Sequence, residues 1–560
     1  MDYPLGERRI NSAMSFIVQN ATGYVFESGR SSALEIMGVI VNRFADEVLL
    51  PTAAEPFFLG LVLIVAKDES SKCREMAAHL LPQLVARFDQ QRLARVWILL
   101  DQWSAGTAAS SQPIDDSADE KAVRAARVKQ LKMRELGRAA LQCYGIIVEP
   151  LGDKFRAQKF LAAVDSALTV SLKTWLSAEA RLNYDDGKDL EQIAMSLGAG
   201  DDPQDTALAY WETAYMAMNS FAKYVRSSDS LGEPRIWLLV VRHLTHPHAW
   251  VRLAAARLIG LYVANADPTW MLTQTVSEQP AEESWDVPVV DVQAKFALMS
   301  FERLRELANA LVVQLSSKHL TAELGNQVVK NLFFIAKCFL AAVPENAADE
   351  EEQEGGSGEE SDEEEETTVE RANLPMDRGL SWLVNRVGRL ARTELIRGRG
   401  ATDKRTYSFR WFAAVVSIIP PALLRQSSYI MPIVSPLYRT LNDTQLARDP
   451  VTLPNGTVKK PEELLEELKA LTNEVVQLTQ TRMGTTEFSK AMLKVKSYVE
   501  KVREQRREQR KQLAVIDPEL HAMKKLKKHK AYKRSRSERS QELARKKIRT
   551  VVKKARNMDI

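Results

Sequence analysis

The fold is decided by the stretch from Pro234 to Val263, which reads PRIWLLVVRHLTHPHAWVRLAAARLIGLYV. Its first part is apolar at positions three and four apart, and its last part carries several alanines, which allow helices to pack closely. Between the two lies the polar turn His246-Pro247-His248, where proline interrupts a helical backbone. The stretch therefore predicts a helix, a tight turn and a second helix.

The opening of this second helix belongs to a pattern that occurs three times. An arginine, an alanine three residues later and an apolar pair beginning three residues after that start at Arg30, Arg74 and Arg252. The first two arginines lie 44 residues apart and the last two 178, or four steps of 44.5, inside the period of roughly 40–47 residues of HEAT and armadillo arrays. We therefore predict an all-α, HEAT- or armadillo-like α-solenoid, in which helix pairs bury their apolar faces against their neighbours.

Composition divides the chain into segments. Residues 345–370 contain 14 acidic and no basic residues, so like charges repel and nothing apolar compensates the ordering entropy. We expect a HEAT-like solenoid over 1–344, an acidic disordered insert over 345–372, continued solenoid over 373–445, a loop over 446–460, a helical hairpin over 461–513 and a basic helical tail over 514–560.

The hairpin prediction depends on apolar residues in a four-three spacing on either side of Gly484. Each run covers about two heptads, fewer than the three to four of a sustained coiled coil. We favour two helices that pack within the chain, and an intermolecular coiled coil is the alternative. The residues are Leu464, Leu468, Leu471, Val475 and Leu478 before the glycine, and Phe488, Met492, Val495, Val499 and Val502 after it.

Catalytic signatures are absent from the sequence. It contains no GxxxxGK[ST] or GxGxxG phosphate loop and no HExxH or GxSxG motif. The histidine cluster of His243, His246 and His248 is expected to form a surface turn, since zinc needs three or four convergent ligands. We predict no catalytic residue, no enzyme activity, no metal, no cofactor and no small-molecule substrate.

Cysteine usage and hydropathy bear on the compartment. Cys73, Cys143 and Cys338 are few and far apart, which is typical of a reducing intracellular protein rather than a disulfide framework. The longest apolar run, residues 56–66, has 11 residues, far fewer than the ~20 that cross a bilayer. We read it as a buried helix and predict no membrane association.

Positive charge is concentrated at the C-terminal end. Residues 494–560 contain 24 Lys+Arg and 8 Asp+Glu, whereas the rest of the chain contains 53 and 65. Self-repulsion should keep the tail extended until a polyanion neutralises it. Several basic clusters exceed what a nuclear-localisation signal alone, the alternative, requires. The predicted RNA-binding residues are Lys524, Lys525, Lys527, Lys528, Lys530, Lys533, Arg534, Arg536, Arg545, Lys546, Lys547, Lys553 and Lys554.

The acidic insert holds two phosphorylation candidates. Ser357 and Ser361 each have glutamate three residues later, which fits an acidophilic kinase site of the casein-kinase type. A passive, solvated loop is the interpretation that we favour for the insert as a whole.

Motifs in the last third of the chain resemble those of a known family. They are Tyr407-Ser408-Phe409-Arg410-Trp411, Pro436-Leu437-Tyr438-Arg439, Met483-Gly484 with Phe488-Ser489-Lys490-Ala491, and Asp517-Pro518-Glu519 before the lysine cluster. In this order they resemble the very large HEAT-repeat proteins of the U-three snoRNP and small-subunit processome, the "down-regulated in metastasis" family. The resemblance is strongest from about 370 to 535 and rests upstream on HEAT character.

The resemblance implies a nucleolar, non-catalytic scaffold for early pre-ribosomal RNA cleavages that lead to the small-subunit RNA. The implied partners are pre-ribosomal RNA, U-three snoRNA and other processome proteins, together with nuclear import receptors for the basic tail. Family members are several times longer, so the chain resembles their C-terminal part. A karyopherin-like transport receptor or another HEAT-repeat adaptor is the alternative, although a karyopherin has no need of a tail with this charge.

Overall fold

A computed structural model describes most of the chain. The described residues are 6–111, 120–181, 210–228, 230–246, 248–273, 293–315, 320–342, 378–392, 400–442, 451–452 and 458–519, with single positions between 522 and 537. They divide into two compact units, Met1–Met483 and Gly484–Ile560. The acidic insert and its candidates Ser357 and Ser361 lie outside the described residues.

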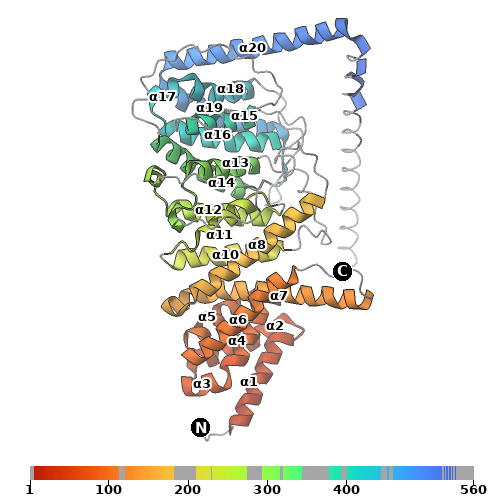
Figure 1. Cartoon of the computed structure of the whole chain (residues 1–560), viewed down its shortest axis with the longest axis vertical. Coiled ribbons are helices and arrows are strands. Elements are labelled where there is room, and N and C mark those ends of the chain that lie inside the picture. Colours follow the sequence, from red (N-terminus) through yellow and green to blue (C-terminus); the bar gives the residue numbers. More distant parts are fainter. Residues whose placement is uncertain are drawn as a thin grey trace. The chain divides into compact units, whose positions relative to one another are not determined.

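The first unit consists of helix pairs that follow one another along the chain (Figure 1). Its eight described pairs are α1 (Gly6–Gly23) with α2 (Glu27–Arg43), α4 (Ala54–Lys67) with α5 (Ser71–Ala86), α6 (Gln90–Ser110) with α7 (Glu120–Leu151), α8 (Ala157–Arg181) with α10 (Trp211–Ser227), α11 (Pro234–His243) with α12 (Ala249–Ala264), α13 (Phe301–Gln314) with α14 (Ala322–Ala341), α15 (Arg378–Arg392) with α16 (Gly400–Ile418), and α18 (Ser427–Leu441) with α19 (Pro461–Met483).

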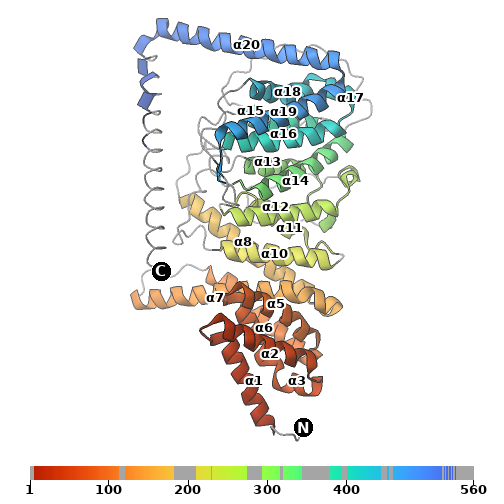
Figure 2. The ribbon, with the colours of Figure 1, turned by 180° about the vertical axis from the view of Figure 1, so that it is seen from behind.

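Successive pairs stack in two layers. The second helices pack in the order α2, α5, α7, α10, α12, α14, α16 and α19, and the first helices pack likewise from α6 to α18. Each pair therefore buries its apolar face against the next pair, as the predicted solenoid requires. The all-α solenoid is confirmed (Figures 1 and 2).

Short elements connect the pairs. These are α3 (Asp46–Thr52), α17 (Pro421–Arg425) and the 3-10 turns η1 (Gly152–Lys154), η3 (Pro268–Thr273) and η4 (Ala294–Phe296). The predicted loop over 446–460 also contains a two-residue antiparallel strand pair, β1 (Val451–Thr452) with β2 (Val458–Lys459).

The repeated arginine has a structural reason. In each copy its guanidinium donates to main-chain carbonyls of the turn before the second helix, which the helix ends leave without partners. Arg30 donates to the oxygens of Tyr24 and Val25 at 2.8 and 3.0 Å. Arg74 donates to those of Asp68 and Glu69 at 2.6 and 3.0 Å, and Arg252 does the same at the α11–α12 turn. The three copies therefore share one register because each arginine holds the turn before its own helix.

Fewer helix pairs are described between the last two copies than the four steps that the spacing predicted. Arg74 lies in α5 and Arg252 in α12, and these helices are three described pairs apart rather than four. The spacing is longer than the usual period because α7 alone has 32 residues and 29 residues separate α8 from α10. An average repeat length does not show that single helices or connections are longer than usual.

The core of the first unit is built by apolar side chains from consecutive pairs. Trp237 of α11 is fully buried, with its ring 4.9 Å from that of Tyr262 and 5.2 Å from that of Phe221. The apolar run over 56–66 lies in α4, eight of whose residues are buried. No single described helix is long and apolar enough to cross a membrane, whereas the bent pair α3 and α4 passes that test by length and composition.

The helix α19 shows how the four-three pattern is used. Leu468 and Val475 are buried, and α19 packs on α16, α17 and α18 within the first unit. The same stripe buries Thr472 and Thr479, whose hydroxyls donate to carbonyl oxygens four residues earlier at 2.6 and 2.7 Å.

The second unit begins at the predicted break. Gly484 has φ of +92°, a conformation that favours glycine, and α20 runs from Thr485 to Ile516, three residues beyond the predicted end of the hairpin. The hairpin itself stays a prediction.

Candidate functional site

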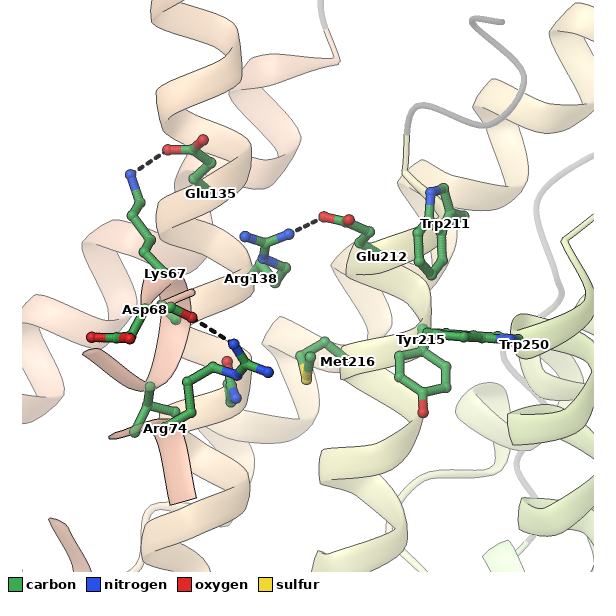
Figure 3. A pocket seen from close by; sticks show the side chains of 13 residues that line it. Lys67, Asp68, Arg74, Glu135, Arg138, Trp211, Glu212, Tyr215, Met216 and Trp250 are labelled. Atoms are coloured by element: carbon green, nitrogen blue, oxygen red, sulfur yellow. Dashed lines mark hydrogen bonds and ion pairs between the residues drawn. The ribbon is translucent and has the colours of Figure 1, made fainter. Parts of the chain in front are cut away.

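A groove of about 620 Å³ opens on the first unit (Figure 3). Its walls come from five helices of four successive pairs, so the solenoid stack assembles it from segments far apart in the sequence. The lining residues are Val65, Ala66, Lys67, Asp68, Arg74, Glu135, Arg138, Gln142, Trp211, Glu212, Tyr215, Met216 and Trp250.

One wall and the floor carry paired charges. Lys67 Nζ lies 2.5 Å from the carboxylate of Glu135, and Arg138 forms an ion pair with Glu212 (Figure 3). The groove as a whole has three cationic and three anionic lining residues. Because these charges balance, the groove has no electrostatic preference for a polyanion.

The opposite wall is aromatic. Trp250 is 58% exposed, and its ring lies 5.9 Å from that of Trp211 and 5.8 Å from that of Tyr215. Trp211 also stacks on the imidazole of His248, with 3.8 Å between centroids and 10° between planes. Exposed tryptophan and tyrosine are enriched at binding hot spots, because they supply a large apolar area at a low entropic cost. The arrangement is suited to binding.

The predicted surface turn of histidines is wrong for two of its three members. His243 and His246 are fully buried, with ring centroids 5.9 Å apart. Burial lowers the pKa of His243 to about 4 and lowers the pKa of His246 as well. Among the described residues, no group of three or more His, Cys, Asp or Glu side chains is placed to hold a metal ion.

The thiols are placed as inert core residues. Cys73, Cys143 and Cys338 are all buried and free. Burial raises the pKa of Cys338 to about 12 and raises the pKa of Cys143. Because the thiolate is the reactive form, neither of these two thiols is set up as a nucleophile.

The predicted RNA-binding residues are only partly described. Lys525, Lys527, Lys530 and Lys533 are exposed and have a helical backbone, and the other nine lie outside the described residues. The predicted fold includes a helical tail, as these four positions have, whereas charge repulsion taken by itself predicted an extended one. The helical conformation is consistent with the propensity of lysine, leucine, methionine and alanine for helix, which opposes the charge repulsion.

Two functional features were missed by the sequence analysis. The aromatic wall could not be foreseen, because Trp211 and Trp250 come from different helix pairs. The run of lysines and arginines between residues 121 and 134 is visible in the sequence, but RNA binding was predicted only for the more strongly basic tail.

Comparison with known proteins identifies relatives over most of the chain. U3 small nucleolar RNA-associated protein 20 of Schizosaccharomyces pombe is 24% identical over 528 residues, which are 94% of this chain and 16% of the relative. The protein of the same name in Saccharomyces cerevisiae is 23% identical over 546 residues, 97% of this chain and 17% of the relative. The chain thus spans about a sixth of the length of these relatives, and the similarity extends well upstream of the region where motifs suggested it.

Solved structures show only a weak likeness. The crystal structure of the karyopherin Kap121p bound to the extreme C-terminus of the protein phosphatase Cdc14p is 11% identical, covers 89% of this chain and 63% of that chain, and has a TM-score of 0.17. Kap121p alone is 11% identical, covers 85% and 62%, and has a TM-score of 0.16. Scores this low carry no argument about function.

The decisive match is to a protein family. Residues 242–542 match the family described as "Small subunit processome component 20 homolog, C-terminal". The matched region runs from the end of α11 through the later helix pairs and α20 into the basic tail. Since it covers more than half of the chain, the protein belongs to the family of small-subunit processome component 20 homologs and corresponds to its C-terminal region.

Proposed function

We propose that the chain is a non-catalytic scaffold segment of the small-subunit processome, which holds pre-ribosomal RNA and processing factors together in the nucleolus. The observation that carries the proposal is the family match over residues 242–542, which includes both solenoid and tail. A scaffold needs long surfaces and no reacting groups, and stacked helix pairs provide such surfaces.

The groove supports the binding of processing proteins. Its charges balance, and its aromatic wall includes the half-buried Trp211 and the exposed Trp250. A neutral, partly apolar groove fits an extended protein segment better than it fits RNA. We therefore assign other processome proteins to the solenoid.

The tail supports the binding of RNA and import receptors. Its described lysines are exposed, and the related yeast proteins are named as associated with U3 small nucleolar RNA. Pre-ribosomal RNA and U3 snoRNA are the proposed ligands. Because phosphate contacts release counterions, the affinity should fall steeply with salt and depend little on RNA sequence.

The test uses the full chain with Lys524, Lys525, Lys527 and Lys528 changed to alanine. If all four contact phosphates, the slope of log K against log salt should become shallower by about 3 on single-stranded RNA, at about 0.7 per contact. RNA filter binding from 50 to 300 mM salt measures it. The matched control changes the exposed lysines Lys72, Lys173, Lys330 and Lys337, and its slope should not change.

Localisation provides the second measurement. A tagged chain without residues 524–560 should leave nucleoli, because import needs one basic cluster whereas retention needs RNA contacts. An unchanged salt slope together with unchanged nucleolar enrichment would contradict the assignment of RNA to the tail.

A further inference from the structure

The N-terminal half of α7 extends beyond the helices around it. α7 has 32 residues, whereas α5, α6 and α10 have 16, 21 and 17. None of residues 121–136 is buried, and regular burial begins at Gly137. Figures 1 and 2 show one end of α7 continuing past its neighbours. We call residues 121–134 the basic arm.

The basic arm carries six cations and no acidic residue: Lys121, Arg124, Arg127, Lys129, Lys132 and Arg134. Arg134 lies over the ring of Tyr210 at 5.1 Å, at the base of the arm. The other five are all exposed. At about 100° per residue they spread over roughly 200° of the helix circumference, outside the half-buried stripe.

The opposite side of the arm is half-buried. Val123, Ala126, Gln130 and Met133 lie there, so the helix has an inner side and a solvent side. The solvent side also exposes Val128 and Leu131, at 46% and 51%. The cations are therefore gathered on the side that a ligand can reach.

Packing within the chain does not explain the charge. Like charges three and four residues apart destabilise an isolated helix. No ion pair is found for Lys121, Arg127, Lys129 or Lys132 among the described residues. A polyanion would remove this repulsion and stabilise the arm.

We propose that the basic arm binds the phosphate backbone of RNA. From Lys121 to Lys132 the helix spans roughly 16 Å, which is the length of several phosphates along one strand. Arginine donors suit phosphate oxygens, and the two apolar side chains between them can contact sugars and bases. The inference rests on the proposed function and adds a second RNA contact, on the solenoid instead of the tail.

The experiment changes Lys121, Arg124, Arg127, Lys129 and Lys132 to glutamine in the full chain. RNA binding is measured by salt titration with a single-stranded and a duplex RNA of equal length. We expect binding at least tenfold weaker at 100 mM salt and a slope shallower by about 3.5 or 4.5, at about 0.7 or 0.9 per contact. Circular dichroism should be unchanged, because the substituted side chains are exposed.

The matched control removes the same number of charges elsewhere in the first unit. Arg43, Lys72, Lys173, Arg226 and Lys330 are exposed on other helices, and changing them to glutamine should alter RNA affinity less than twofold. Both groups of substitutions are also made in the tail variant. The loss of RNA affinity caused by the arm and that caused by the tail are then measured separately.

Two results would overturn the proposal. One is an arm variant with the affinity and slope of the unchanged chain in both tail backgrounds, which leaves the tail assignment intact. The other is an arm that binds an acidic peptide, such as residues 345–370 of this chain, while RNA does not compete. If only the tail variant lost RNA affinity, the proposed function would stand and RNA binding by the basic arm would be excluded.

Discussion

Arg252 is a charged side chain in a position that is almost entirely buried. It is 4% exposed, and its Nη1 donates to the oxygen of His246 at 2.9 Å. Burial lowers the pKa of this guanidinium to about 10, so it remains protonated at neutral pH. The guanidinium thus loses the favourable hydration of a cation, and its hydrogen bond fixes the conformation of the turn.

Replacing Arg252 with alanine should destabilise the α11–α12 pair by about 1–3 kcal/mol, because the buried oxygen of His246 loses its donor. Hydrogen exchange should show faster amide exchange in α11 and α12. Arg257→Ala is the control on the same helix, where an exposed pair with Glu323 at 2.8 Å is worth ~0–1 kcal/mol. Equal effects of the two changes would refute the role of the buried hydrogen bond.

His243 makes stability depend on pH. Its pKa is about 4 in the folded chain and about 6.5 when unfolded, so the unfolded state takes up a proton first as the pH falls. The neutral side chain makes its full contribution to the free energy of unfolding above pH 6.5. That contribution declines between pH 6.5 and 4, and below pH 4 the free energy of unfolding is lower by about 3 kcal/mol.

The measurement is the urea midpoint between pH 4.5 and 7.5 for the unchanged chain and for His243→Gln. Glutamine keeps a donor for the Leu239 oxygen, which the imidazole now contacts at 2.8 Å, but does not titrate. The variant should show a smaller decline below pH 6.5. Parallel curves would mean that other groups, such as carboxylates, cause the decline.

The sequence could not reveal this burial. His243 and His246 flank a polar turn, which is normally exposed, yet the ring of His246 lies 5.9 Å from that of Trp175 in α8. The residue that buries the ring of His246 thus comes from another helix pair, about seventy residues earlier in the chain. Local pattern identifies a turn, whereas its exposure depends on which pair lies beside it.

At the scale of elements, α7 is positioned by a close approach to α10. A Cβ atom on Gly145 would lie 3.0 Å from the Cα of Ser220, and the hydroxyl of Ser220 donates to the oxygen of Leu141 at 2.7 Å. Glycine is needed here for space rather than for its backbone freedom. The contact lies about one helical turn from Gln142, which lines the groove.

Gly145→Ala should separate α7 from α10 and lower the stability by about 1–3 kcal/mol through overpacking. The thermal midpoint and the tryptophan fluorescence of the groove measure it. Gly23→Ala is the control, because a Cβ there meets nothing within 4 Å; its midpoint should stay or rise slightly. If Gly145→Ala left the thermal midpoint unchanged, the two helices would be able to move apart without loss of stability.

The elements themselves were largely predictable. Arginine register and apolar spacing identify α2, α5 and α12, because each turn needs the same donor and each helix the same buried side. Pair number was not predictable, since α7 is lengthened without a change of periodicity. The groove was not predictable either, because no sequence signal links α10 to α5.

At the scale of the whole molecule, the first unit lacks a single centre. Among the described helices, the extensive contacts of each pair are with its neighbours in the stack, so stability is a sum of local terms. A defect in one pair should weaken the adjacent pairs and leave remote ones unchanged.

Phe339→Ala tests this locality. The ring is fully buried and lies 5.4 Å from that of Phe301, so its loss should cost about 3–5 kcal/mol. Hydrogen exchange should accelerate in α13 to α16 and stay unchanged in α1 to α5. Uniform acceleration throughout the first unit would indicate one cooperative core in place of a solenoid.

The junction between the first two pairs differs from the others in mechanical terms. Asp68, in the turn between α4 and α5, accepts two hydrogen bonds from Arg30 of α2 at 2.8 and 3.0 Å, and both side chains are nearly buried. The same residue's carbonyl accepts from Arg74, so one aspartate fastens two turns together. A pull along the stack would therefore strain the junctions whose ion pairs are more exposed, such as that of Lys67 with Glu135, before this one, which would act as a stiff segment in an otherwise elastic stack.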